Sequence, residues 1–420
     1  MASLRILRSE KKKFVQVLLP ASKSISTRLC VLKALYPDKI HVENMSEADD
    51  VRLMEKNLNA IKTCSDSSIP LVIDAGNSGA VMRFLTAYAS VYPGKRLITG
   101  SKRLKERPLG PLVDSLKSLE ADIQYAGEAG FIPLLINGKE LEGSKVSTDP
   151  GVSSQFVSAL LLIANELPDG LELILEKEAA SGGYIDLTIG ILKKAGIRIE
   201  HLNEAIILRK SKLEKTTYHV ESDWASASFW YEFVCFSPDT EIILKGLERK
   251  SSQPEAILPE LFAMLGAETT FDVDGISIRK VSAPLKKISY DFRDNPDLAL
   301  PFITATALGG SDAYFSGLEN LKYKESDRLD ALIDLLTRLS VALDTDAKTK
   351  ISLKRSEAGL PESINFNCRN DHRLIMTAAP LAIVLRKGIV LKEHHGLEKS
   401  YPGYWDDLQA SGLELQPSNH

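Results

Sequence analysis

Strongly apolar segments of helical length recur six times along the chain, and each follows small or polar residues of the kind that cap helices. The gaps between successive segments are 54 to 75 residues. The segments begin at Ser22, Gly76, Gly151, Ser222, Pro296 and Asp371. Because a helix that is apolar on nearly every side must be buried on most of them, we expect these helices to pack together in the interior.

A second, more amphipathic helix is predicted 27 to 32 residues after the start of each apolar one. These helices begin at Asp49, Glu106, Gly183, Ser252, Glu325 and Ser400. Short β-branched runs such as KRLITG, FIPLLING, LELILE, AIILRK, TEIILKG and GIVLKEH lie beside them and predict strands. Two offset series of six helices indicate six related βαβ-type repeats.

The first repeat is short. Its second helix is followed after 27 residues by the next apolar helix, against 39 to 46 residues later in the chain. We therefore expect it to lack a β-hairpin. Six repeats favour an α/β fold of two domains with three repeats each, and since no Pro/Gly/Ser-rich linker separates them, the domains should be joined by short strand crossings.

Composition excludes several classes of function. The 420 residues include 52 Lys and Arg against 56 Asp and Glu, a net charge of −4, which argues against a nucleic-acid or anionic-membrane binder. The apolar content of 44% and charged content of 26% are typical of a globular chain. Four widely spaced cysteines favour neither a zinc site nor disulfides, and no segment is typical of a signal peptide or membrane span. We expect a soluble cytoplasmic protein without a metal.

The start of the first apolar helix has the residues of an anion site. Lys23 stands at the helix start, and Ser24 and Arg28 share a helix face. Main-chain N–H groups, the helix dipole and two cations would converge there, as in sites that hold a phosphate or carboxylate. A capped surface helix explains the same residues.

Two further helix starts carry more polar groups than capping requires. Ser153, Ser154 and Gln155 are consecutive, whereas capping a helix needs only one such side chain. Contact with a ligand and ordinary capping are both possible interpretations. At the second apolar helix, Asn77 and Gly79 would let a ligand approach the backbone closely.

Two arginines near these starts need explanation. Arg83 lies between Met82 and Phe84, so it requires a buried partner or an anion. Arg107 precedes Pro108 and should be extended at a helix entrance, where a solvated charge is the simplest interpretation.

The second half of the chain concentrates charges in KYKESDRL. Lys324 and Arg328 are a like-charge pair at i, i+4, which is unfavourable unless an anion lies between them, while Glu325 adds a carboxylate. A capping charge cluster is the alternative. Asp297 would cap an apolar helix, or act as a catalytic carboxylate if it faced a cleft.

The sequence NDHR places Asp371, His372 and Arg373 before an apolar run, and Lys399 is uninformative by itself. The chain has no phosphate-binding P-loop, dinucleotide-binding glycine pattern, HExxH motif or nucleophile elbow.

Nine segments resemble, in order and spacing, the motifs of the 5-enolpyruvylshikimate-3-phosphate synthase family of enolpyruvyl transferases. They are LPASKSISTR, AGNSGAVMRFL, LKERPLG, VSSQF, SGGYIDLT, NPDLAL, LKYKESDRL, NDHR and KSYP, and they extend from about residue 18 to 407. The resemblance implies an inside-out α/β barrel of two domains, each of three βαβαββ repeats. The domains would comprise residues 1–20 with 222–420, and residues 21–221.

The resemblance also implies the reaction: the carboxyvinyl group of phosphoenolpyruvate passes to the 5-hydroxyl of shikimate 3-phosphate and phosphate is released, in the pathway to aromatic amino acids. No cofactor is implied, and the family habit is a monomer. Two alternatives are a UDP-N-acetylglucosamine enolpyruvyl transferase and an inactive binder of phosphorylated metabolites. The first uses a loop cysteine as its acid, and here the only loop candidate is Cys64, which lies outside any matching motif.

Residue by residue, the family pattern implies two ligand sets, drawn from both domains. With Asn77 added for its place beside Gly79, the phosphoenolpyruvate set is Lys23, Asn77, Gly79, Arg107, Gln155, Arg328, Arg373 and Lys399. The shikimate 3-phosphate set is Lys23, Ser24, Arg28, Ser153, Ser154, Gln155, Ser181, Asp297, Asn320 and Lys324.

Three residues are expected to act on protons or on the leaving phosphate. Asp297 would meet the 5-hydroxyl, Glu325 would serve the vinyl carbon, and Lys23 would exchange a proton or stabilise the phosphate. The chain departs from the family pattern at Ala21, where glycine is usual. It departs again at Ala80 and Phe84, where the family usually has threonine and proline.

Overall fold

The structure is a computed structural model, which describes residues 3–64, 69–149, 153–176, 182–202, 204–355 and 359–418. The chain divides into two compact units. Unit 1 comprises Met1–Ala21 and Glu221–His420, and unit 2 is the continuous stretch Ser22–Val220. The domains predicted from the sequence differ from these units by one residue at each crossing. None of the described helices is both long and apolar enough to cross a membrane.

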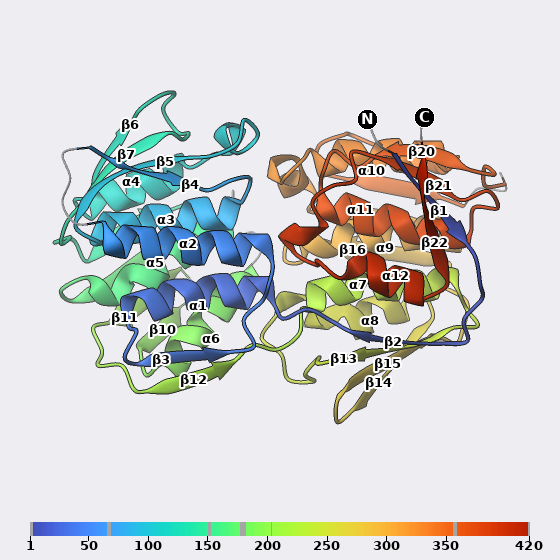
Figure 1. The fold of residues 1–420 in the computed structure, drawn as a ribbon, viewed down its shortest axis with the longest axis horizontal. Helices are drawn as coiled ribbons and strands as arrows, with labels where there is room; N and C mark the ends of the chain where they lie inside the picture. The colour runs from blue at the N-terminus through green and yellow to red at the C-terminus, as the bar shows by residue number, and fades with distance from the viewer. Residues whose placement is uncertain are drawn as a thin grey trace. The chain divides into compact units, whose positions relative to one another are not determined.

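Unit 1 repeats one plan three times (Figure 1). Each repeat runs β-α-β-α-β-β, and its first two strands pair in parallel while the last strand pairs antiparallel to the second. The first repeat contains β2 (Phe14–Leu18), α7 (Trp224–Phe236), β13 (Glu241–Lys245), α8 (Leu258–Ala263), β14 (Ala267–Asp272) and β15 (Gly275–Lys280). The second contains β16 (Lys287–Asp291), α9 (Ala299–Gly309), β17 (Asp312–Ser316), α10 (Arg328–Arg338), β18 (Ala342–Thr345) and β19 (Ile351–Lys354).

The third repeat of unit 1 is completed by the beginning of the chain. It contains β20 (Ile364–Asn367), α11 (His372–Ala378), β21 (Ile389–Lys392), α12 (Tyr404–Ala410), β22 (Leu413–Ser418) and β1 (Ser3–Arg8). Strand β1 occupies the place of the last strand, between β21 and β22, and Ser3 lies opposite Ser418 in the register.

Unit 2 has two complete repeats and one short one. The complete ones contain β4 (Leu71–Asp74), α3 (Gly79–Val91), β5 (Gly94–Thr99), α4 (Gly110–Ser118), β6 (Asp122–Tyr125) and β7 (Leu134–Gly138), then β8 (Lys145–Thr148), α5 (Ser154–Ile163), β9 (Gly170–Leu175), α6 (Gly182–Lys194), β10 (Arg198–Leu202) and β11 (Ala205–Arg209). The short repeat contains β12 (Thr216–His219), α1 (Lys23–Leu35), β3 (Ile40–Glu43) and α2 (Asp49–Thr63). Among the described residues its sheet has two strands instead of four, which confirms the predicted loss of a hairpin.

The predicted helices all form, but several begin three or four residues later than expected. Three apolar helices are capped by a polar side chain: Ser78, Ser153 and Asp371 each accept a hydrogen bond from a main-chain N–H of the first turn. Helix α4 begins at Gly110 instead of Glu106, because Arg107 is extended before Pro108.

The apolar helices form the cores, as predicted. Helices α7, α9 and α11 pack on one another in unit 1, and α1, α3 and α5 do so in unit 2. In each unit helices lie inside and sheets outside (Figure 1). Helix α7 is buried along nearly its whole length, including Trp224, Phe229 and Trp230.

One acidic side chain lies in this core. Glu232 of α7 is fully buried, and within the described structure neither of its carboxylate oxygens has a hydrogen-bond partner. Helix α9 and the 3₁₀ turn Ala379–Ile383, which pack on α7, contain no charged residue. Burial therefore raises the pKa of Glu232 well above its ordinary value, because the ionised form loses its hydration.

The buried acid predicts a pH-dependent stability of unit 1. Above the ordinary carboxyl pKa, unfolded Glu232 is ionised while the folded side chain stays protonated, so the free energy of unfolding falls as the pH rises. Glu232→Gln should remove this dependence. As the pH rises above the ordinary carboxyl pKa, the difference between the variant and the unmodified protein should change by at most about 1.4 kcal/mol per pH unit.

Urea unfolding followed by tryptophan fluorescence measures this effect in unit 1 alone, since Trp224, Trp230 and Trp405 all lie there. The matched control is Glu260→Gln, at an exposed glutamate of α8. Parallel stability profiles for the Glu232 variant and the unmodified protein would contradict the prediction.

Candidate active site

The beginnings of four helical segments in unit 1 carry the predicted charged residues. Asp297 lies in the 3₁₀ turn Pro296–Leu298 before α9, and Arg328 is the first residue of α10. Arg373 is in the first turn of α11, and Lys399 ends the 3₁₀ turn Leu397–Lys399 before α12. The repeats thus bring side chains that are up to 102 positions apart in sequence to equivalent helix starts.

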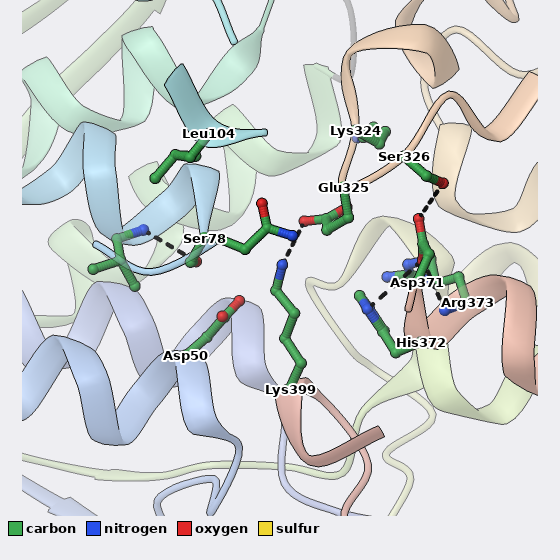
Figure 2. Close-up of polar contacts among 12 residues, drawn as sticks. Asp50, Ser78, Leu104, Lys324, Glu325, Ser326, Asp371, His372, Arg373 and Lys399 are labelled. Atoms are coloured by element: carbon green, nitrogen blue, oxygen red, sulfur yellow. Dashed lines mark hydrogen bonds and ion pairs between the residues drawn. The ribbon is translucent and has the colours of Figure 1, made fainter. Parts of the chain in front are cut away.

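Two carboxylates within this unit share a set of cations. Asp297 accepts a hydrogen bond of 2.9 Å from Arg373 and one of 3.3 Å from Arg328, and the Lys324 ammonium lies 3.6 Å away. Glu325 pairs with Arg328 at 2.8 Å and with Lys399 at 3.1 Å. Figure 2 shows the Lys399 side chain extended toward Glu325. We call these six residues the ion network.

Arg328 joins the two carboxylates and is itself held by Asp371. The Arg328 side chain is about 2% exposed, and its Nε donates to Asp371 Oδ2 at 2.9 Å and its Nη2 to Asp371 Oδ1 at 3.1 Å. The same carboxylate accepts from the Ser326 hydroxyl and from the main-chain N–H of Arg373 (Figure 2). Asp371 therefore fixes the position of both arginines.

The ion network determines the charge of Asp297. Burial by itself would raise the pKa of this carboxyl, but the positive charges of Arg373, Lys324 and Arg328 outweigh it and hold the pKa well below its usual range. Asp297 is therefore ionised near neutral pH. It can accept a proton or a hydrogen bond but cannot donate one.

In unit 2, the predicted anion site at the start of α1 has a carboxylate neighbour. The Lys23 ammonium lies 3.2 Å from Asp50, a buried residue in the first turn of α2. Arg28 is buried one turn into α1, where it donates to the Thr188 hydroxyl at 2.7 Å and to the Ser24 main-chain oxygen at 2.8 Å. The role of Ser24 and Arg28 in binding an anion stays a prediction.

A second group of residues in unit 2 converges on the start of α3. Gly79 is its first residue, and a Cβ there would lie 2.5 Å from Nη2 of Arg107 and 2.7 Å from Nη1 of Arg83. A side chain at this position would require the two guanidinium groups to move. Arg83 in turn donates to the Gln155 side-chain oxygen at 2.6 Å.

The remaining predicted residues are placed as follows. Ser153 caps α5 by accepting from the Gln155 N–H, and Ser154 is buried next to it. Asn77 accepts a hydrogen bond from the Ser101 hydroxyl. Asn320 is partly buried in the 3₁₀ turn Glu319–Tyr323 of unit 1. Ser181 lies outside the described residues.

The sequence reasoning missed Asp50 and gave Asp371 no role beside its arginines. Asp50 follows Asp49, which the sequence analysis used only as the start of an amphipathic helix. Asp371 read as a helix cap, which it also is. Among the described residues, no three His, Cys, Asp or Glu side chains gather in a way that could hold a metal ion.

Comparisons with known proteins agree on one family. A family model described as EPSP synthase (3-phosphoshikimate 1-carboxyvinyltransferase) matches residues 10–408. The chain is 38% identical over 403 residues to the 3-phosphoshikimate 1-carboxyvinyltransferase of Bacteroides fragilis, with 95% of each chain covered. It is 29% identical over 412 residues to the protein of that name from Methanoculleus marisnigri, with 94% of this chain and 96% of the relative covered.

Solved structures share the fold. The EPSP synthase of Acinetobacter baumannii superposes with a TM-score of 0.76 at 20% identity, over 99% of this chain and 100% of that one. The enolpyruvyl transferase NikO of Streptomyces tendae gives a TM-score of 0.75 at 13% identity, over 99% of each chain.

The Arg328–Asp371 pair generates a stability prediction. Asp371→Asn keeps a capping side chain on α11 but leaves the buried guanidinium without its full counter-charge, so unit 1 should lose about 3 kcal/mol of unfolding free energy. Urea unfolding followed by tryptophan fluorescence measures the loss.

The matched control is Asp334→Asn, which removes the exposed carboxylate that pairs with Arg338 at 2.8 Å on the same helix as Arg328. An exposed pair of this kind is worth about 0.5 kcal/mol or less. Similar losses in the two variants would contradict the importance of the buried pair.

Proposed function

Because this chain belongs to the EPSP synthase (3-phosphoshikimate 1-carboxyvinyltransferase) family, we propose that it transfers the carboxyvinyl group of phosphoenolpyruvate to the 5-hydroxyl of shikimate 3-phosphate and releases phosphate. The reaction is a step of the shikimate pathway to aromatic amino acids. Units 1 and 2 are proposed to be the two domains of the enzyme.

The ion network is the structural observation that supports this proposed function. The two substrates together present two phosphates and two carboxylates, so the enzyme needs many cations, while proton transfer needs carboxylates among them. A site that only bound anions would bind them better without acidic groups. Unit 1 combines both kinds of residue, namely Lys324, Arg328, Arg373 and Lys399 with Asp297 and Glu325.

Addition and elimination place different demands on the acids and bases. In the addition, the 5-hydroxyl oxygen bonds to C2 of phosphoenolpyruvate, a base takes the hydroxyl proton and an acid gives a proton to C3. In the elimination, C3 loses a proton, the C2–O bond to phosphate breaks and the double bond re-forms. We assign the hydroxyl to Asp297 and C3 to Glu325, and we assign Lys23 to the leaving phosphate.

The pairing of Asp297 suggests how its basicity is controlled. With three cations around it the ionised carboxylate is a weak base. Substrate anions compete for the same cations, and each cation that turns toward a substrate oxygen removes stabilisation from the carboxylate. The pKa of Asp297 therefore rises as the substrates bind, and its ability to accept the hydroxyl proton rises with it.

The ligand residues are proposed in two sets. For phosphoenolpyruvate they are Lys23, Asn77, Gly79, Arg107, Gln155, Arg328, Arg373 and Lys399. For shikimate 3-phosphate they are Lys23, Ser24, Arg28, Ser153, Ser154, Gln155, Ser181, Asp297, Asn320 and Lys324. Charge-assisted hydrogen bonds from arginine and lysine supply most of the affinity.

We propose a cytoplasmic location and a monomer. The location is supported by Cys30, Cys235 and Cys368, which form no disulfide in the described structure.

One assay tests the function against its alternatives. Purified protein with phosphoenolpyruvate and shikimate 3-phosphate should release inorganic phosphate, and replacing shikimate 3-phosphate by UDP-N-acetylglucosamine should abolish the release. Release only with the UDP-sugar would assign the chain to the other transferase. No release with either acceptor would identify a binding protein.

Glu325→Gln tests the assigned proton transfer. In heavy water the unmodified enzyme should exchange hydrogen into the vinyl methylene of phosphoenolpyruvate during turnover, which NMR measures. The variant should stop this exchange and lower the rate of phosphate release by about 10² to 10⁴, since an amide cannot transfer the proton.

The control is Glu319→Gln, at an exposed residue of the 3₁₀ turn Glu319–Tyr323 that precedes Glu325. It should keep both the hydrogen exchange and the phosphate release. Full exchange in the Glu325 variant would show that another group serves C3.

A further inference from the structure

We infer that Arg83 is a positioning residue for the reaction: it sets the orientation of the Gln155 amide and holds the main chain next to Arg107. The inference rests on the proposed function, since Gln155 and Arg107 are proposed ligands of phosphoenolpyruvate. Arg83 itself belongs to neither ligand set.

The geometry places Arg83 between two proposed ligand residues. Its side chain is buried in α3, with an exposure of 2%. Nη1 donates to the Gln155 side-chain oxygen at 2.6 Å, and Nη2 donates to the main-chain oxygen of Pro108 at 3.0 Å. The guanidinium carbon lies 5.1 Å from the centre of the Phe156 ring, which holds it from the side of α5.

The contact with Arg83 decides which end of the Gln155 amide is available to a ligand. A guanidinium has donors and no acceptor, so the amide atom that faces it must be the oxygen. The amide nitrogen then points away from Arg83, and in the described part of the chain no group accepts a hydrogen bond from it. Gln155 is partly exposed, so it presents two N–H donors, which suit an anionic ligand.

Without Arg83 the amide could turn over. Its oxygen would then face a carboxylate or phosphate, and two acceptors would repel each other. The hydrogen bond at Nη1 therefore selects the orientation that binds an anion over the orientation that rejects it. Such selection is invisible in the sequence, where glutamine supplies both kinds of group.

Arg83 also supports Arg107 through the backbone. The Pro108 carbonyl follows directly on Arg107, whose backbone is extended with φ −89° and ψ 130°. The guanidinium groups of Arg83 and Arg107 approach the same point above Gly79. By holding the Pro108 carbonyl, Arg83 fixes the segment from which Arg107 extends, and its own positive charge adds to the attraction of an anion.

Arg83→Lys tests the inference, because lysine keeps the charge and loses the planar fork that reaches both acceptors. Steady-state phosphate release at saturating shikimate 3-phosphate should give a KM for phosphoenolpyruvate about 10- to 100-fold higher, in keeping with the loss of charged hydrogen bonds. The control Arg103→Lys, at a more exposed arginine that pairs with Glu106, should leave KM unchanged.

A double-mutant cycle separates positioning from general stability. If Arg83 acts mainly through Gln155, adding Arg83→Lys to Gln155→Ala should raise KM by no more than about 3-fold over Gln155→Ala alone. Independent effects that multiply would overturn the assigned orientation of the Gln155 amide, which is the main step of the inference. A lowered melting temperature with an unchanged KM would assign Arg83 a structural role only, and this would overturn it too.

Gln155→Glu provides a test that leaves Arg83 intact. The carboxylate still accepts from Arg83 but presents an oxygen to the ligand, as the turned-over amide would. It should raise KM at least as much as Gln155→Ala, whereas a purely structural contact would be kept or strengthened. An unmodified enzyme that releases no phosphate would refute the proposed function, while an active enzyme with normal KM in these variants would refute this inference alone.

Discussion

A buried ion pair between Arg328 and Asp371 fixes the geometry of the candidate site in unit 1. The arginine begins one helix and the aspartate caps the next, so the pair joins two repeats at the point where their helices start. Arg328 then reaches both Asp297 and Glu325. The two carboxylates proposed for proton transfer are thus both held by one guanidinium. The position of that guanidinium is set by its hydrogen bonds to Asp371.

The two units balance buried positive charge in different ways. In unit 1 the arginines face carboxylates, and Asp297, Glu325 and Asp371 offset three of the four positive charges of the ion network. In unit 2, Arg83 faces an amide and a carbonyl oxygen, and Arg96 donates to the main-chain oxygens of Tyr92 and Ile61 near the ends of two helices. Neutral acceptors stabilise a guanidinium without cancelling its charge.

The repeats could be predicted from the sequence because each one shows in the local order of apolar and polar residues. The alternation of apolar and amphipathic helices gave all six repeats, and the short spacing after α2 predicted its two-stranded sheet. Helix starts were less accurate, because a run such as NSG or SSQ offers several possible caps and only backbone geometry selects one. The same local reasoning found most charged residues that the structure brings together in unit 1.

Pairings between distant residues could not be predicted in this way. Arg83 was recognised as needing a partner, but nothing near it in sequence indicates an amide 72 positions later. Asp50 and Asp371 looked like ordinary helix-start residues, since their second role depends on Lys23 and Arg328 arriving from other elements. Local sequence determines which groups are present at a helix start, and the packing of repeats determines which of them meet.

Strand β1, from the beginning of the chain, completes the last sheet of unit 1, and this restricts the order in which the protein can fold. Unit 2 is continuous, so all of its described strands are synthesised before the second part of unit 1. Strand β1 is made first but must wait for β21 and β22, its neighbours in the last sheet. During synthesis β1 therefore remains without its partners until β21 and β22 have emerged, and the last sheet of unit 1 closes only then.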